Sequence, residues 1–212
     1  MNINRKGVKM KLPIEFYNRN TLSVAKELLG KILVRTIEGK PVMGKIVEVE
    51  AYLGPIDKAC HSYNFKKTPK NEAMYGPAGT CYVYFIYGMY YCLNVVTEEE
   101  GMPCAVLIRA IEPLEGLDIM ALNRFGKKYS ELKTAERKNL TNGPGKLCKA
   151  LNIDKSLNKK SLLGDEIYIL DNKEKFEIVS DKRIGIDYAE EAKDFEWRFY
   201  IKDNPYVSVL KK

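Results

Sequence analysis

A carboxylate, a phenol and the chain's single imidazole lie close together in the sequence, at Glu50, Tyr52 and His61. In the stretch "PVMGKIVEVEAY" the period-two alternation of a strand places Ile46, Glu48, Glu50 and Tyr52 on one face, with Val47, Val49 and Ala51 on the other. A carboxylate next to aromatic surface is partly desolvated, which strengthens it as a general base. A glutamate seen alone on a half-buried strand is more often part of a solvated face or an ion pair, so both interpretations stay open here.

The stretch "YVYFIYGMYYCLN", residues 82–94, holds five tyrosines and one phenylalanine. We predict two strands, 80–86 and 89–96, joined at Tyr87 and Gly88, because Gly88 permits the positive φ of a tight turn. An exposed Tyr87 at a hairpin tip is suited to wedging into a base stack, and an inward ring such as Tyr84 is suited to stacking on a base. The alternative is an aromatic core strand whose tip tyrosine has no special role.

Composition narrows the class of protein. The 212 residues carry 35 Lys and Arg against 28 Asp and Glu, a net charge of +7, which weakly favours a polyanionic partner such as nucleic acid. The five cysteines form no CxxC pair and His61 is the single histidine, so we expect free thiols in a reducing compartment and no zinc or other metal site. With no apolar run near the ~18 residues of a membrane span and no apolar stretch in the basic N-terminus, we expect a cytoplasmic protein, associated with the nucleoid if prokaryotic.

The elements that position these residues follow from periodicity and turn signals. We predict a helix over 20–30, a hairpin of 31–37 with 41–52, a long ordered loop over 53–79 and a buried strand in "CAVLIRAIEPLEG" that ends near Arg109. We also predict helices at about 114–125 and from Pro144, and short strands within 166–170, 176–180, 197–201 and 206–210. No boundary signal divides the chain. The prediction is therefore one α+β domain, 1–212, with a curved, mostly antiparallel sheet, flanking helices and a protruding β-hairpin.

Four motifs in order, "EVEAYLGPIDKACHS", "TPKNEAMYGPAGTCYVYFIYGMYYCLNVV", "CAVLIRAIEPLEG" and "NGPGKLCKAL", closely resemble the alkyladenine (3-methyladenine) DNA glycosylase family of base-excision repair. The resemblance runs from about residue 12 to 210 and is weakest between 155 and 195. The loop "YNFKK" at 63–67 departs from the small, Gly- and Arg-containing segment of relatives. This departure concerns the pocket rim and nearby phosphate contacts rather than the chemistry.

The resemblance implies a role for individual positions. Glu50 matches the general base that activates water, and Arg109 matches the arginine beside that water and the nucleotide backbone. Tyr52, His61 and Tyr84 match the residues that sandwich the extruded purine. Asn94 matches the residue that excludes the exocyclic amino group of guanine, and Tyr87 the intercalating tyrosine.

The resemblance thus implies a monofunctional glycosylase, without cofactor, that flips and hydrolytically excises alkylated purines from double-stranded DNA and leaves an abasic site; deaminated purines stay open. We expect a monomer that also uses Lys146, beside the helix start at Pro144, on the DNA backbone, although a solvated lysine explains Lys146 equally well. Two rivals remain. One is a noncatalytic nucleic-acid-binding module with the same stacking surface, and the other is a hydrolase of free nucleosides.

Overall fold

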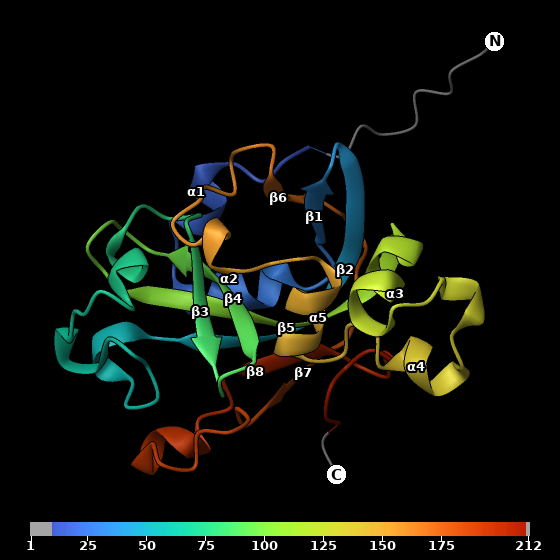
Figure 1. The fold of residues 1–212 in the computed structure, drawn as a ribbon. Helices are drawn as coiled ribbons and strands as arrows, with labels where there is room; N and C mark the ends of the chain where they lie inside the picture. Colours follow the sequence, from blue (N-terminus) through green and yellow to red (C-terminus); the bar gives the residue numbers. More distant parts are fainter. Residues whose placement is uncertain (1–9, 211–212) are drawn as a thin grey trace.

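A long antiparallel pair of strands, β2 (Lys40–Tyr52) and β5 (Cys104–Glu115), runs through the middle of the sheet (Figure 1). The structure is a computed structural model, and residues 10–210 are described here. The other strands are β1 (Ile32–Ile37), β3 (Cys81–Ile86), β4 (Tyr90–Thr97), β6 (Ile167–Leu170), β7 (Ile178–Asp181) and β8 (Arg198–Ile201). All pairings between these strands are antiparallel, which confirms the predicted sheet.

β2 has β5 along one edge and two different partners along the other. Its first half pairs with β1, which continues to β6, whereas Glu48 to Glu50 pair with β8, which continues to β7. The register between β2 and β5 shifts at Met43/Gly44, Ile46/Glu48 and Glu48/Val49. Such bulges bend a strand and increase its twist, so they account for the curl of the sheet and interrupt the simple alternation predicted for β2.

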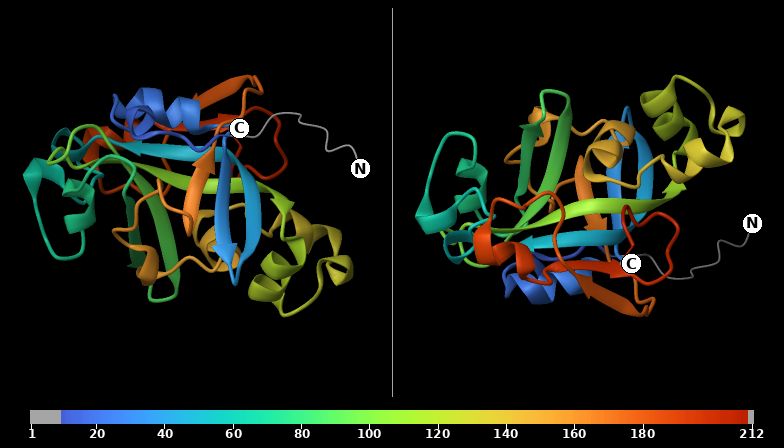
Figure 2. Two further views of the ribbon diagram at one scale, coloured as in Figure 1. Left: turned by 90° about the horizontal axis from the view of Figure 1, so that it is seen from above. Right: turned by 90° about the horizontal axis from the view of Figure 1, so that it is seen from below.

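Helices cover both sides of the sheet (Figure 2), with α1 (Ile14–Tyr17) and α2 (Thr21–Leu28) opposite the group formed by α3, α4 and α5. These last three are α3 (Leu117–Phe125), α4 (Thr134–Lys138) and α5 (Pro144–Ala150). The predicted helices at 20–30 and from Pro144 are confirmed. Asn20 caps α2 by accepting a hydrogen bond from the Ser23 amide, and Pro144 occupies the first turn of α5.

Both predicted hairpins are present. The turn between β1 and β2 has positive φ at Glu38 (49°) and Gly39 (75°), which matches the twist of the flanking strands. The turn between β3 and β4 has positive φ at Tyr87 (54°) and Gly88 (67°), and Ile86 pairs with Tyr90 across it. The loop 53–79 contains three short 3-10 turns, Gly54–Ile56, Tyr63–Phe65 and Glu72–Tyr75.

Two predictions about elements were wrong. β5 does not end near Arg109 but continues to Glu115, because Pro113 pairs opposite Gly44 beside a bulge, where a missing ladder donor is tolerated. The helix after it consequently begins at Leu117, after Gly116 in a left-handed conformation. Residues 206–210 are no strand, since the Ser208 amide donates to the Glu48 carboxylate and the Val209 carbonyl accepts from Arg198 instead of joining a ladder.

All five cysteines are buried and free. Over residues 10–210, none of the helices has the length and apolar character needed to cross a bilayer. The start of the chain, residues 1–9, on which the expectation of a cytoplasmic protein partly depended, lies outside the described residues.

Candidate active site

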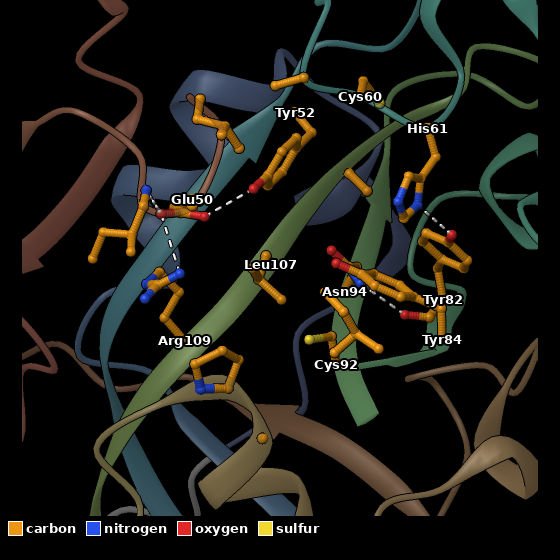
Figure 3. A pocket seen from close by; sticks show the side chains of 18 of the residues that line it. Glu50, Tyr52, Cys60, His61, Tyr82, Tyr84, Cys92, Asn94, Leu107 and Arg109 are labelled. Carbon is orange, nitrogen blue, oxygen red and sulfur yellow. Dashed lines mark hydrogen bonds and ion pairs between the residues drawn. The ribbon is translucent and has the colours of Figure 1, made fainter. Parts of the chain in front are cut away.

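A cavity of about 510 Å³ opens beside the β3–β4 hairpin (Figure 3). Its walls come from β2, β3, β4 and β5, from the 53–79 loop, from the start of α5 and from residues 184–188. Seven side chains predicted from the sequence line this cavity: Glu50, Tyr52, His61, Tyr84, Tyr87, Asn94 and Arg109. Its volume lies within the ~300–1,000 Å³ of small-molecule pockets.

Glu50 sits in the cavity wall with no surface exposed to solvent. Its Oε1 accepts a hydrogen bond from the Ile184 amide at 2.7 Å and pairs with Arg109 Nη1 at 3.2 Å. Its Oε2 accepts from the Tyr52 hydroxyl at 2.9 Å (Figure 3). A carboxylate oxygen has two lone-pair sites, so Oε2, with one donor among the described residues, retains capacity for a further hydrogen bond.

Arg109 connects Glu50 to a second buried carboxylate, Glu48. The Arg109 Nε donates to Glu48 at 3.0 Å, and Arg198 binds both Glu48, at 3.1 Å, and Asp181. Burial alone lowers the pKa of Arg109, but the charges of Glu50 and Glu48 outweigh it and hold this pKa above its ordinary value. With all groups ionised, three carboxylates face two guanidinium groups. The network then carries one excess negative charge, and Glu50 is its one carboxylate that lines the cavity, beside Arg109.

Glu48 and Glu50 differ in their surroundings although they project from the same face of β2. Glu48 accepts hydrogen bonds from Arg109, Arg198 and both the amide and the hydroxyl of Ser208, and it does not line the cavity. This arrangement gives Glu48 a structural role.

Aromatic side chains form the opposite wall. His61 Nδ1 lies 2.8 Å from the Tyr82 hydroxyl, and the His61 ring meets Tyr84 edge to face with centroids 4.7 Å apart. Desolvation, and secondly the charge of Lys70, lower the pKa of His61. Burial, and secondly the charge of Glu50, raise the pKa of Tyr52 well above its ordinary value. The Tyr52 hydroxyl therefore stays protonated and donates a hydrogen bond to Glu50.

Asn94 is 4% exposed and faces the cavity from β4. Its Nδ2 donates to the Tyr82 carbonyl at 3.0 Å, which fixes the amide plane (Figure 3). The side chain therefore presents a rigid wall rather than a flexible contact.

Tyr87 stands at the hairpin tip and is 76% exposed, with Met89 beside it at 65%. Both the rim of the cavity and the tip are thus formed by one hairpin. The hairpin packs closely on α5 just after its turn, because a Cβ at Gly145 would lie only 2.7 Å from the ring of Tyr90, the first residue of β4. A larger residue at position 145 would displace the hairpin from its place above the cavity.

Lys146 is the one predicted site residue that does not line the cavity. Its Nζ donates to the side-chain oxygens of Asn139 and Asn142, at 2.8 Å each. Burial, and then the charge of Arg124, lower its pKa.

Several cavity residues were missed by sequence analysis. They include Tyr82, which holds His61, and the segment 184–188, which contributes the Ile184 amide and the exposed Tyr188. A backbone amide leaves no trace in residue type, and this segment lies where the resemblance is weakest. Tyr82, in contrast, belongs to the tyrosine-rich stretch 82–94, and this position was a signal that it could contribute to the site.

Comparison with known proteins gives one family. The model of the Methylpurine-DNA glycosylase (MPG) family matches residues 15–205. A relative from Clostridium acetobutylicum, named "Putative 3-methyladenine DNA glycosylase", is 60% identical over 96% of this chain and all of its own length. Relatives of the same name from Desulfitobacterium hafniense and Clostridium perfringens (strain SM101) are 60% and 58% identical, over 92% and 94% of this chain and 97% and 99% of their own lengths. The chain therefore belongs to the methylpurine-DNA glycosylase family.

Proposed function

We propose that this protein flips methylated purine nucleotides out of duplex DNA and hydrolyses their N-glycosyl bonds, leaving an abasic site. Family membership makes it a hydrolase of the DNA-3-methyladenine glycosylase type. The finer proposal depends on one observation: a buried carboxylate, Glu50, shares the wall of a cavity with several aromatic rings, beside a hairpin with an exposed tyrosine at its tip.

Glu50 supplies the chemistry in this proposal. Cleavage of a glycosidic bond proceeds through an oxocarbenium-like transition state, which a nearby negative charge stabilises. The free lone pair of Oε2 accepts a proton from the attacking water, while the Ile184 amide and Arg109 hold Oε1 in place. Arg109, pinned by Glu48, orients the water and the sugar-phosphate beside it.

The rings supply recognition of the base. A purine nucleotide methylated at N3 or N7 carries positive charge on the base, which therefore leaves readily, and stacking on the faces of Tyr52, His61 and Tyr84 favours a cationic base. His61 with a lowered pKa is neutral at pH 7 and does not repel that cation. Asn94 excludes guanine, because the Tyr82 carbonyl holds the Asn94 amide rigidly and the amide cannot move aside for the exocyclic amino group of guanine.

Tyr87 supplies the wedge. Flipping costs a few kcal/mol, and an aromatic ring that fills the vacated position in the stack offsets part of this cost. The exposure of Tyr87 favours duplex DNA over free nucleosides as substrate, since a nucleoside hydrolase has no use for a protruding ring. In this proposal one monomer acts alone, and Lys146 contributes to backbone binding beside the start of α5.

The test is direct. The purified protein is incubated with duplex DNA treated with a methylating agent, released bases are separated by chromatography, and the DNA is heated in alkali to break it at abasic sites. We expect release of 3-methyladenine and alkali-dependent breaks. Single-stranded DNA and free methylated nucleosides serve as comparison substrates, and a hypoxanthine duplex tests the extension to deaminated purines. Binding of the methylated duplex without release of any base would support the noncatalytic alternative instead.

A further inference from the structure

A second buried ion pair lies just behind the cavity. Arg183 Nη1 and Nη2 contact the Asp57 carboxylate at 2.5 and 2.8 Å, and both side chains have no exposed surface. The guanidinium also donates to the carbonyls of Ala51 and Ala192. A buried ion pair seldom stabilises a fold more than apolar residues of the same volume would. Stability alone therefore does not explain this one.

Arg183 lies over the faces of two aromatic rings. Its Cζ lies 4.7 Å from the centroid of the Tyr52 ring and 5.1 Å from that of Trp197. Tyr52 lines the cavity, but Arg183 does not, and its side chain is inaccessible. The face of Tyr52 that Arg183 covers is thus closed to a base, and the guanidinium supports the ring from behind.

The same short segment also holds the carboxylate. The Ile184 amide, next in the chain, donates to Glu50 Oε1 at 2.7 Å, and the Tyr52 hydroxyl donates to Oε2 at 2.9 Å. Anchoring Arg183 to Asp57 therefore fixes both the ring against which the base stacks and the two groups that orient Glu50.

We infer that Arg183, anchored by Asp57, is a positioning residue that aligns the stacking ring of Tyr52 with the Glu50 carboxylate. This inference rests on the proposed function. Displacements of about 1 Å in such positioning groups can cost on the order of 100-fold in rate. The planar shape of the guanidinium is what matters here, because a flat group packs against ring faces while it binds a carboxylate with two parallel hydrogen bonds.

The test uses Arg183→Lys, which keeps the positive charge for Asp57 but cannot stack as a plane. Single-turnover excision of 3-methyladenine from duplex DNA is measured with enzyme in excess, together with duplex affinity and melting temperature. The matched control is Arg35→Lys. Arg35 is also buried and donates to the carbonyls of Thr36 and Glu166, and none of these residues lines the cavity. We expect excision to slow at least about tenfold in Arg183→Lys and to change less than about twofold in Arg35→Lys.

A double-mutant cycle separates positioning from general stability. In a Tyr52→Leu background, Arg183→Lys should slow excision by a clearly smaller factor than in the wild type, because the part of its action that passes through that ring is already lost. A wild-type rate for Arg183→Lys, or the same loss with and without Tyr52, would overturn the inference. If Arg183→Lys does not fold, Trp197→Leu decides, since it removes the outer ring of the stack: a few-fold loss supports the inference and an unchanged rate overturns it. Absence of excision by the wild-type protein would count against the proposed function itself.

Discussion

Replacing Glu50 by glutamine removes the charge and the base while preserving the shape of the side chain. The glutamine carbonyl can take the place of Oε1 and accept from the Ile184 amide and Arg109. Its amino group then faces the Tyr52 hydroxyl, which can rotate to accept instead of donate. Arg109 keeps its partner Glu48 at 3.0 Å, so no buried charge is left unpaired.

The magnitudes follow from these contacts. The lost charge-assisted bond costs about 1–3 kcal/mol of unfolding free energy, which lowers Tm by no more than about 10 °C. Loss of a positioned general base costs about 10²–10⁴-fold in rate, and loss of the negative charge under the sugar adds to it. We therefore expect Glu50→Gln to bind methylated duplex as the wild type does and to excise at least about 100-fold more slowly.

The assay is single-turnover excision on one methylated duplex, with affinity measured on the same DNA by anisotropy. Glu48→Gln is the matched control, because Glu48 lies on the same face of the same strand but outside the cavity. Glu48 accepts four hydrogen bonds, two of them from arginines. Glu48→Gln should therefore lower the free energy of unfolding more than Glu50→Gln does, by about 3–5 kcal/mol, and should slow excision less. Excision by Glu50→Gln within about tenfold of the wild-type rate would refute the assignment of Glu50 as base.

Three further results are expected. Tyr87→Ser, at a position 76% exposed, should leave Tm unchanged but weaken lesion-duplex binding and reduce the 2-aminopurine fluorescence change that reports flipping; an unchanged response would exclude the wedge. Folding lowers the pKa of His61 below its ordinary 6.5, so as the pH falls the imidazole of the unfolded chain is protonated before that of the folded protein. The free energy of unfolding should therefore be independent of His61 above pH 6.5 and decrease below it. Urea titrations should show a smaller decrease below pH 6.5 in His61→Gln than in the wild type. Asn94→Ala should raise excision of 7-methylguanine relative to 3-methyladenine by about tenfold, measured as a ratio of single-turnover rates, and an unchanged ratio would remove Asn94 from selectivity.

The sequence predicted the parts of this molecule that depend on local patterns. Asn20 before an amphipathic stretch, Glu38 and Gly39 between two strand patterns, and Tyr87 and Gly88 at a turn all specify their conformations through residues close in the chain. Where long-range pairing decides, prediction failed. The extension of β5 past Arg109 depends on the bulged partner strand β2, and residues 206–210 have a strand-like pattern whose backbone groups bind Glu48 and Arg198 instead.

The candidate site shows the same division. Side chains of the cavity wall on β2 to β5 could be named in advance, whereas the support behind them could not. Arg183 and Asp57 are 126 positions apart, and neither residue type indicates that the two meet behind Tyr52. The Ile184 amide is invisible to any analysis of side chains.

The choice between Glu48 and Glu50 illustrates why the surroundings of a residue decide its chemistry. Strand periodicity makes the two equivalent, and both bind Arg109. Around Glu48, Oε1 accepts from Arg109, Arg198 and the Ser208 hydroxyl, Oε2 accepts from the Ser208 amide, and the side chain has no contact with the cavity. At Glu50 the donors are fewer and the cavity begins, so Oε2 alone combines a free acceptor site with access to a bound nucleoside. Glu48 also fixes Arg109, so the carboxylate outside the cavity holds the cation that the one inside it needs.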